Sequence, residues 1–418
     1  MKKGEDKMDK KIKNRIIAIS GEPVSGKGRT VEELKKELIK EGLKEENIHI
    51  ISTGTKFREY FNKIIEFMKN RDNDEKLKEM ENDPFMKQFL SNRKFRTSLT
   101  NTIAKIESRK IDLDKKDSIE AANNSRLFSE VRNSVDSLID TETRTIGKQI
   151  NEKERKGEVW IFDSRMAFDN IPEAFSVRLT TRPNVAAERL FNDFTRGTED
   201  NKYKNIEEAL KARENRRLGE IERYKKRYNV DLENKDNYNL IIDTSYADPE
   251  DVVKTVLTCE KYYEEGKKFA RDWDSPVTMI PCQRISQTWG KLFDDDLSLE
   301  EMEEKIATEG YDPSSAIEVC KINGVNYILE GHHRNFACMA LGNTLIPYID
   351  EMETEKGKEL LKRGTYPVTR RADLFDHEDL AENLLRKSKD DPSLRFSYSE
   401  IYPNILDEIE KSALKDER

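Results

Sequence analysis

The stretch Arg15-Ile-Ile-Ala-Ile-Ser-Gly21-Glu-Pro-Val-Ser-Gly26-Lys27-Gly28-Arg29-Thr30 decides the fold of the N-terminal part of this chain. Its first six residues form a short apolar run, which is typical of a buried strand. Four apolar residues then recur at helical spacing before Gly42 ends the pattern: Val31, Leu34, Leu38 and Ile39. The sequence therefore predicts a strand, a glycine-bearing loop and a helix in succession.

This loop lies where a phosphate cradle forms, between the end of a strand and the start of a helix. Backbone amides and the helix dipole can surround phosphates there, while Lys27 neutralises their charge. We expect ATP and Mg²⁺ to bind through seven residues of the loop: Gly21, Ser25, Gly26, Lys27, Gly28, Arg29 and Thr30. Gly28 stands where most such loops carry Ser or Thr for magnesium. Arg29 either adds a phosphate contact or marks an altered site.

Four more runs of strand character follow, separated by helical patterns: residues 48–52, 158–163, 175–180 and 238–243. Near-continuous apolar strands that alternate with helices predict an α/β fold, with a parallel sheet covered by helices on both faces. Residues 57–154 are dense in charge at helical spacing. We expect several helices of a capping subdomain there, most of whose residues are solvated.

The loop resembles that of nucleoside monophosphate kinases, many of which carry Gly-Lys-Gly as residues 26–28 do here. Further segments resemble cytidylate kinases, the last two those of archaeal type, and follow in that family's order: 52–58, 159–165, 176–189, 223–231 and 238–245. The resemblance covers about residues 15–257, with an enlarged and divergent middle at 57–154. It implies a P-loop kinase that transfers phosphate from ATP to a nucleoside monophosphate such as CMP or dCMP.

The resemblance also implies roles for individual residues in the acceptor half of the site. Arg58 and Arg165 would hold the acceptor phosphate, and Asp163 would orient a magnesium-bound water. Ser164 stands where the family has glycine. For the acceptor base, the divergent region supplies only Arg144 as a candidate.

A helix predicted over residues 206–228 carries arginines spaced by three, four and seven residues: Arg213, Arg216, Arg217, Arg223 and Arg227. Such spacing places subsets of them on one face, as a lid over a transferring phosphoryl group requires. We assign Arg213 and Arg217 a catalytic role, and Arg216 and Arg223 a role in nucleotide binding. A charged helix solvated on all sides is the alternative, because Glu214, Glu220 and Glu222 are interleaved.

A second pattern begins after a helix that Asp248 is expected to cap and a connecting segment at 258–275. Residues 276–355 are predicted to form a small α+β domain, with a helix at 299–308 and Asn323-Gly324 as a hairpin turn. Its strands are expected at 277–280, 316–322, 325–329 and 344–349. Residues 1–14 are expected to be a disordered tail and 356–418 a helical extension.

The segment Glu330-Gly331-His332-His333-Arg334 resembles the signature of the ParB and sulfiredoxin superfamily. ADP-dependent free serine kinases in that superfamily share Gly-His-His-Arg after an acidic residue. The resemblance implies a site for ATP, ADP or CTP and a free amino acid, in which Glu330 and His333 are catalytic and the other three residues bind the nucleotide. One of Asp294, Asp295 and Asp296 is a further candidate base. Sulfiredoxin chemistry is disfavoured because His332 replaces its cysteine.

Composition narrows the classes of function. A net charge of -8 disfavours a nucleic-acid coat, and no apolar run approaches the roughly 20 residues that span a bilayer. We therefore expect a cytoplasmic protein that binds no membrane. Four cysteines without paired spacing, and two adjacent histidines, predict no metal site and no disulfide framework. The rival to a kinase is a regulatory or scaffold protein in which nucleotide binding switches a partner interaction.

Overall fold

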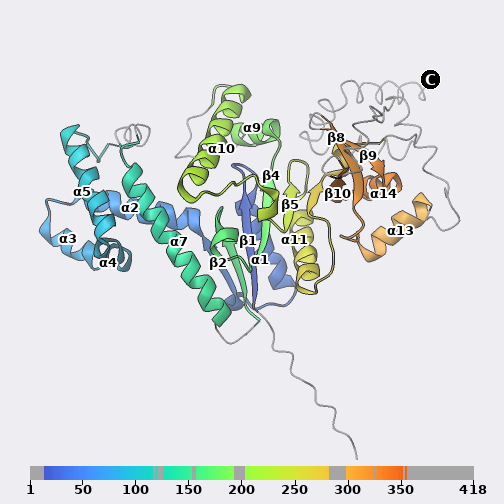
Figure 1. Ribbon diagram of the computed structural model, residues 1–418, viewed down its shortest axis with the longest axis horizontal. Coiled ribbons are helices and arrows are strands. Elements are labelled where there is room, and N and C mark those ends of the chain that lie inside the picture. Colours follow the sequence, from blue (N-terminus) through green and yellow to red (C-terminus); the bar gives the residue numbers. More distant parts are fainter. Residues whose placement is uncertain are drawn as a thin grey trace, which may run out of the picture. The chain divides into compact units, whose positions relative to one another are not determined.

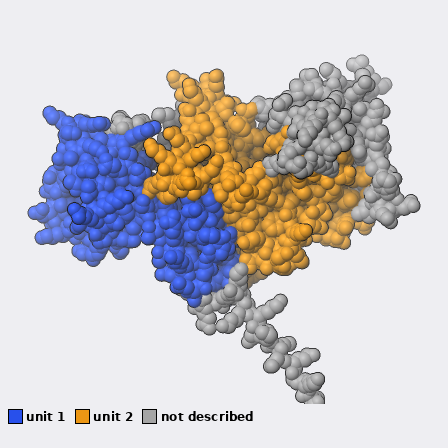
Figure 2. All heavy atoms as spheres, in the orientation of Figure 1, with its two compact units in different colours: residues 1–18, 44–174 blue, residues 19–43, 175–418 orange. Residues whose placement is uncertain are grey.

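The computed structural model describes residues 14–115, 119, 126–152, 157–192, 203–281, 298–322, 325–351 and 354 (Figure 1). The chain divides into two compact units, which Figure 2 colours separately. One comprises residues 1–18 and 44–174, and the other comprises 19–43 and 175–418. The predicted hairpin turn at 323–324, the candidate bases at 294–296, residues 1–13 of the predicted tail and residues 356–418 lie outside the described residues.

The first unit contains two parallel strands and the start of a third. β2 (Ile48–Ser52) pairs in parallel with β3 (Val159–Asp163), so that Ser52 lies opposite Asp163. β1 (Arg15–Gly21) begins in this unit, where the Arg15 amide donates to the Glu158 carbonyl at 2.9 Å. All three strands were predicted from their apolar runs.

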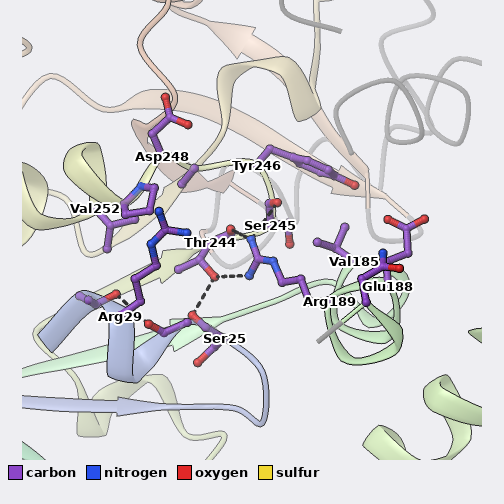
Figure 3. A pocket seen from close by; sticks show the side chains of 15 residues that line it. Ser25, Arg29, Val185, Glu188, Arg189, Thr244, Ser245, Tyr246, Asp248 and Val252 are labelled. Carbon is purple, nitrogen blue, oxygen red and sulfur yellow. Dashed lines mark hydrogen bonds between the residues drawn. The ribbon is translucent and has the colours of Figure 1, made fainter. Parts of the chain in front are cut away.

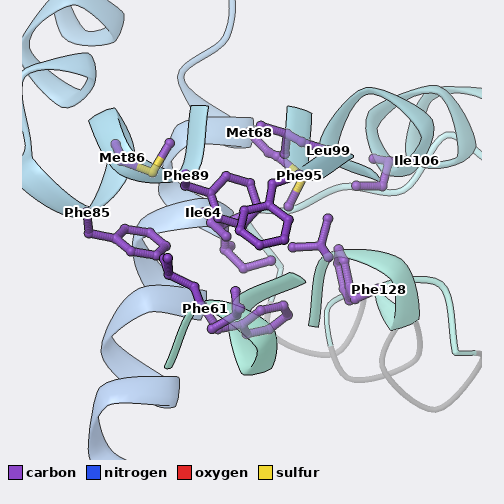
Figure 4. Close-up of a cluster of buried hydrophobic side chains, with 14 of the residues drawn as sticks. Phe61, Ile64, Met68, Phe85, Met86, Phe89, Phe95, Leu99, Ile106 and Phe128 are labelled. Atoms are coloured by element: carbon purple, nitrogen blue, oxygen red, sulfur yellow. The ribbon is translucent and has the colours of Figure 1, made fainter. Parts of the chain in front are cut away.

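The charged region 57–154 forms helices with an aromatic core of its own. The helices are α2 (Thr53–Lys69), α3 (Asp74–Glu81), α4 (Pro84–Ser91), α5 (Arg93–Ser108) and α7 (Ser129–Glu152). Figure 4 shows their buried side chains, among them Phe61, Phe85, Phe89, Phe95 and Phe128. Most described residues of this region are at least partly exposed, as expected, while α2, α4, α5 and α7 each turn a few apolar residues inward.

The second unit contains the end of β1 and the strands from β4 onward. Its strands are ordered β1-β4-β5-β6-β10-β8-β9-β7. Their bounds are Phe175–Thr180 for β4, Leu240–Asp243 for β5, Asp272–Asp274 for β6, Met279–Pro281 for β7, Ile317–Ile322 for β8, Val325–Glu330 for β9 and Ile346–Asp350 for β10. β4 with β5, β5 with β6, β8 with β10 and β7 with β9 are parallel pairs, whereas β6 with β10 and β8 with β9 are antiparallel. The predicted α/β class with a mostly parallel sheet is confirmed.

Six helices of this unit matter for the site. They are α1 (Lys27–Lys40), α9 (Pro183–Phe191), α10 (Ile206–Tyr228), α11 (Pro249–Glu264), α13 (Leu299–Glu309) and α14 (His332–Leu341). Proline in the first turn of α9 and of α11 is preorganised for a helix start. In the described part of the chain, no helix has the length and apolar character needed to cross a membrane.

The segment at 258–275, expected to be a connecting helix or linker, begins as the C-terminal part of α11. α11 ends at Glu264, and β6 then joins the sheet between β5 and β10. The C-terminal elements nevertheless have their own apolar cluster, which includes Ile306, Val319 and Ile328. The C-terminal strands β7 to β10 therefore belong to the same sheet as β1, the strand that precedes the glycine-bearing loop.

Candidate functional site

The loop between β1 and α1 turns through two residues with left-handed backbone. Gly26 has φ 77° and caps α1, and Val24 has φ 68°. Gly21 is required by packing, because a Cβ there would lie 2.5 Å from Ser25 Oγ and 3.0 Å from the Leu179 carbonyl oxygen. Consecutive amides in such a turn form an anion-binding concavity. The backbone thus has the geometry expected from the sequence.

Val24 is the unexpected member of this loop. A β-branched residue in the left-handed region is a genuine outlier. Its side chain packs against a small cluster formed by Ala187, Leu190 and Ala209 on helices α9 and α10. That apolar contact explains why a valine occupies a position suited to glycine, and it attaches the loop to both helices.

A cavity of about 560 Å³ lies beside the loop (Figure 3). This volume falls within the range of small-molecule sites. Three parts of the second unit line it: the loop, helix α9, and the segment 244–248 with the start of α11. The lining residues include Ser25, Gly26, Arg29, Thr30, Val185, Glu188, Arg189, Thr244, Ser245, Tyr246, Asp248 and Val252. The cavity thus lies at the carboxyl ends of β1, β4 and β5, where ligands of open α/β sheets bind.

Arg189 connects the walls of this cavity, as the dashed lines in Figure 3 show in part. Its guanidinium donates to the Thr244 hydroxyl at 3.3 Å and to the Thr244 and Ser245 carbonyls at 2.5 and 3.2 Å. The Thr244 hydroxyl in turn lies 3.0 Å from the Ser25 carbonyl. Sequence reasoning missed Arg189 and residues 244–246 as site residues, although their place directly after β4 and β5 was a usable signal.

Two loop side chains have unused binding capacity. Ser25 Oγ is buried and has no hydrogen-bond partner among the described residues. Arg29 lines the cavity and forms no ion pair within the part of the chain that the structure describes. Buried polar groups are normally hydrogen-bonded, so an unpartnered hydroxyl at a cavity wall is a position that a ligand could satisfy.

Lys27 and Gly28 open α1. Lys27 is half-buried, and Gly28 is exposed, with nothing within 4 Å of where its Cβ would be. Gly28 is therefore not required by packing, and a serine or threonine would fit there. Thr30 donates through its hydroxyl to the Gly26 carbonyl at 3.3 Å.

The arginines of α10 are placed in different ways. Arg213 is buried, pairs with Glu22 of the loop and donates to the Thr181 carbonyl at 3.1 Å. Arg217 pairs with Glu214 at 2.8 Å and with Glu233. Arg216 is exposed and lies 3.4 Å from Glu220, and Arg223 and Arg227 lie over the rings of Tyr224 and Tyr228. Arg213 is thus the arginine of α10 that ties the helix to the loop, through Glu22.

In the first unit, Asp163 lies at the end of β3 and accepts a hydrogen bond from the Ser52 hydroxyl at 2.8 Å. Arg58 is exposed and donates to the Thr55 hydroxyl at 3.1 Å. Arg165 is half-buried just after β3. The structure therefore joins Ser52 to Asp163, and it places Arg58 on the first turns of α2.

A polar cluster between α2 and α7 was not expected from the sequence. Glu142 accepts hydrogen bonds from Lys56 at 3.2 Å and from the Tyr60 hydroxyl at 3.1 Å. Burial, with the neighbouring Glu142 carboxylate, raises the pKa of Tyr60. Arg144, two residues further along α7, pairs with Asp169 at 3.7 Å.

The C-terminal loop 330–334 is built around Gly331. Its φ is 97°, and a Cβ there would lie 2.6 Å from Ile317 Cγ2, so that only glycine fits. Glu330 is exposed and His333 is half-buried. Burial, followed by the charge of His333, lowers the pKa of His332 to about 4. His332 is therefore neutral at pH 7.

Arg334 does not present a free guanidinium at this loop. It donates to the carbonyls of Ser315 and Ala316 at 2.7 and 2.9 Å. The sequence predicted a cation held ready for phosphate, whereas the described contacts use Arg334 to fix the start of β8 against α14. Cys259 and Cys338 are buried free thiols.

Comparison with protein-family models and with curated proteins finds no match for this sequence.

Proposed function

We propose that this chain is a nucleotide-dependent phosphotransferase whose loop 21–30 binds ATP and whose acceptor is a nucleoside monophosphate such as CMP or dCMP. One observation carries the proposal: a glycine-bearing turn at the start of α1 opens onto a cavity of about 560 Å³ at the carboxyl ends of three strands. Phosphates suit the amides at the helix start, and the remainder of a nucleotide suits the cavity.

Residues of the second unit have distinct parts in this proposal. Lys27 would neutralise the terminal phosphates from the first turn of α1. The Ser25 hydroxyl, buried beside the cavity, would gain its missing partner from the ligand. Arg29 would contribute a positive charge to the cavity wall. Together they position and neutralise the phosphates, which is most of what phosphoryl transfer asks of a protein.

Magnesium suits the proposed site as an ion carried by the nucleotide. Within the described residues, no group of three or more His, Cys, Asp or Glu side chains could hold a metal. Mg²⁺ commonly keeps several waters and binds substrate phosphates with few protein ligands. When bound, it would neutralise charge on the phosphates. Gly28 offers it no side-chain ligand.

The acceptor half of the reaction rests on the resemblance to cytidylate kinases. Arg58 and Arg165 would bind the acceptor phosphate, with Asp163 beside Ser52 at the end of β3. The Glu142 cluster on α2 and α7 is a further polar surface in this unit. Arg165→Ala is expected to weaken use of the acceptor far more than ATP binding, and equal losses in calorimetry would contradict the assignment.

A second nucleotide site is proposed at loop 330–334, with a serine-like amino acid as acceptor. The supporting observation is that Gly331 turns the chain from β9 into the N-terminus of α14. Glu330 would act as base or magnesium partner. Glu330→Gln is expected to keep nucleotide binding and lose transfer to free serine. If the full chain with Lys27→Ala binds neither ATP, ADP nor CTP, this second site is absent.

The experiment that tests the main proposal compares Lys27→Ala with Lys36→Ala. Both are lysines of α1, but Lys36 is exposed, lies outside the loop and forms an ion pair with Glu33 at 2.8 Å. Purified variants are titrated with Mg-ATP and assayed for phosphate transfer to CMP and dCMP. Lys27→Ala should abolish transfer, and Lys36→Ala should retain it. ATP binding without transfer to any acceptor would favour the regulatory alternative, and unchanged ATP affinity in Lys27→Ala would refute the loop site.

A further inference from the structure

The segment 244–248 forms one wall of the cavity, and Thr344 of the C-terminal region bonds to it without lining the cavity. Thr344 lies between α14 and β10 and is buried. Its hydroxyl accepts a hydrogen bond from the Asp248 amide at 3.0 Å and donates to Asp251 Oδ2 at 2.6 Å. The Thr344 amide donates to the same Asp251 oxygen at 2.9 Å. A hydroxyl has one donor and two acceptor positions, so this arrangement is self-consistent.

These bonds replace the ordinary start of a helix. Asp248 is the N-cap of α11, as the sequence predicted, but its side chain makes no capping hydrogen bond. In a capping box the third residue of the helix, here Asp251, accepts from the N-cap amide. Here the Thr344 hydroxyl is inserted between those two groups. The start of α11 and the end of the cavity wall are therefore completed by a residue more than 90 positions away.

A second connection reaches the same wall from β6. The Arg182 amide donates to the Ser245 hydroxyl at 2.8 Å, and its guanidinium carbon lies 5.5 Å from the centre of the Tyr246 ring. The same guanidinium donates to Asp274 Oδ2 at 3.0 Å. Asn326 of β9 also lies beside that carboxylate, at 3.4 Å. An ion pair with the last residue of β6 thus fixes the guanidinium that lies over Tyr246, and the backbone of the same arginine bonds to Ser245.

We infer that the C-terminal strands are a working part of the nucleotide cavity, and that Thr344 and Asp274 are positioning residues that hold its wall at 244–248. The inference rests on the proposed function. Binding segments on loops depend on a rigid scaffold behind them, because small displacements weaken several contacts at once. Neither Thr344 nor Asp274 lines the cavity, so both act through the wall.

Two parts of the nucleotide would contact different parts of the site. The loop at 21–30 takes the phosphates, whereas the wall at 244–248 faces the cavity that takes the remainder. Loss of the Thr344 hydroxyl should therefore weaken the binding of ATP and leave the binding of inorganic tripolyphosphate unchanged. A general loss of structure in the second unit would instead weaken the binding of both ligands to a similar extent.

The test uses calorimetric titration of the full chain with Mg-ATP and with magnesium tripolyphosphate. Thr344→Val keeps the shape and removes the hydroxyl, Thr344→Ser keeps the hydroxyl, and Asp274→Asn removes the charge that faces Arg182. Thr308→Ala is the control, because among the described residues its hydroxyl bonds to carbonyls of its own helix, α13. We expect Thr344→Val and Asp274→Asn to raise the Kd of ATP about tenfold, with tripolyphosphate changed less than about twofold. Thr344→Ser and Thr308→Ala should match the wild type.

The outcomes are distinct. Unchanged ATP affinity in Thr344→Val, or an equal loss for ATP and tripolyphosphate, overturns the inference while the wild-type titration still supports nucleotide binding. A wild type that binds tripolyphosphate but not ATP overturns the nucleotide proposal itself, and with it this inference. If Thr344→Val does not fold, the contrast between ATP and tripolyphosphate in Asp274→Asn decides the matter.

Discussion

Arg213, which is buried on α10, forms an ion pair with Glu22, the residue that follows Gly21 in the loop. Arg178 of β4 approaches the same carboxylate at 3.3 Å. Glu22 therefore lies between two cations from different elements. The resemblance assigns Arg213 to the transferring phosphate, but the contacts described here give it a structural role in holding α10 to the loop.

Replacing Arg213 should destabilise the second unit strongly. Glu22 would keep Arg178 as a partner, but it would lose one of its two cations and the buried Thr181 carbonyl would lose its donor from Arg213, which together cost about 2–3 kcal/mol. We expect Arg213→Met to lower the free energy of unfolding by that amount in urea titrations. Arg216→Met is the matched control on the same helix, since its side chain is 54% exposed, and it should change stability by less than about 0.5 kcal/mol. Equal stability of the two variants would contradict the buried pair.

The backbone of Val24 predicts an inverted order for two substitutions. Glycine to alanine usually stabilises a chain, but a Cβ in the left-handed region costs about 1–2 kcal/mol. Val24→Gly and Val24→Ala both lose the contact with Leu190, and only alanine keeps the strain. We expect Val24→Gly to be more stable than Val24→Ala by about 1 kcal/mol in thermal unfolding. The opposite order would show that the left-handed turn is not adopted.

His332 should make stability depend on pH. Because the pKa of His332 falls to about 4 in the folded state, folding favours the neutral ring. The contribution of His332 to the free energy of unfolding is complete above its pKa in the unfolded chain, near 6.5. It is lost as the pH falls through 4, by about 3 kcal/mol in total. The free energy of unfolding of wild type, compared with His332→Gln, should decline from pH 7 to pH 4. A difference that stays constant with pH would refute the shifted pKa.

Titration of Asp274 should change the stability of the protein in the opposite direction, over nearly the same pH range as His332. Burial, with the nearby Asp243 carboxylate, raises the pKa of Asp274 to about 6 although Arg182 opposes it. Its contribution is complete below about pH 4 and is lost as the pH rises through 6. Relative to Asp274→Asn, the free energy of unfolding of the wild type should fall between pH 4 and pH 7. The check is the same urea series, and a difference that grows with pH would contradict the sign.

The N-terminal strand, loop and helix could be predicted from the sequence because their signals are local. The apolar run at 15–20 and the spacing from Val31 to Ile39 correspond to β1 and α1, and the helix predicted at 206–228 is α10. The strands expected at 316–322 and 325–329 are β8 and β9 within one residue. Period and glycine placement act over a few residues, so no tertiary information was needed.

β6 and the aromatic core of the first unit could not be predicted from local sequence patterns. β6 is three residues long and carries two aspartates, so it has no apolar pattern, and it is a strand only because β5 and β10 lie on either side. In residues 57–154 the dense charge hides apolar positions such as Phe89, whose burial depends on neighbouring helices. Burial of this kind is a property of the packed unit and not of the segment.

The sequence by itself determined that a glycine-bearing turn stands between β1 and α1, since Gly21, Gly26 and Lys27 are neighbours along the chain. Only the tertiary structure decided what surrounds that turn. Arg213 reaches Glu22 across 191 positions, Thr344 reaches Asp248 across 96, and Arg182 reaches Asp274 across 92. Hydrogen bonds and ion pairs act over a few ångströms in space whatever the separation along the chain, so no local pattern encodes these contacts.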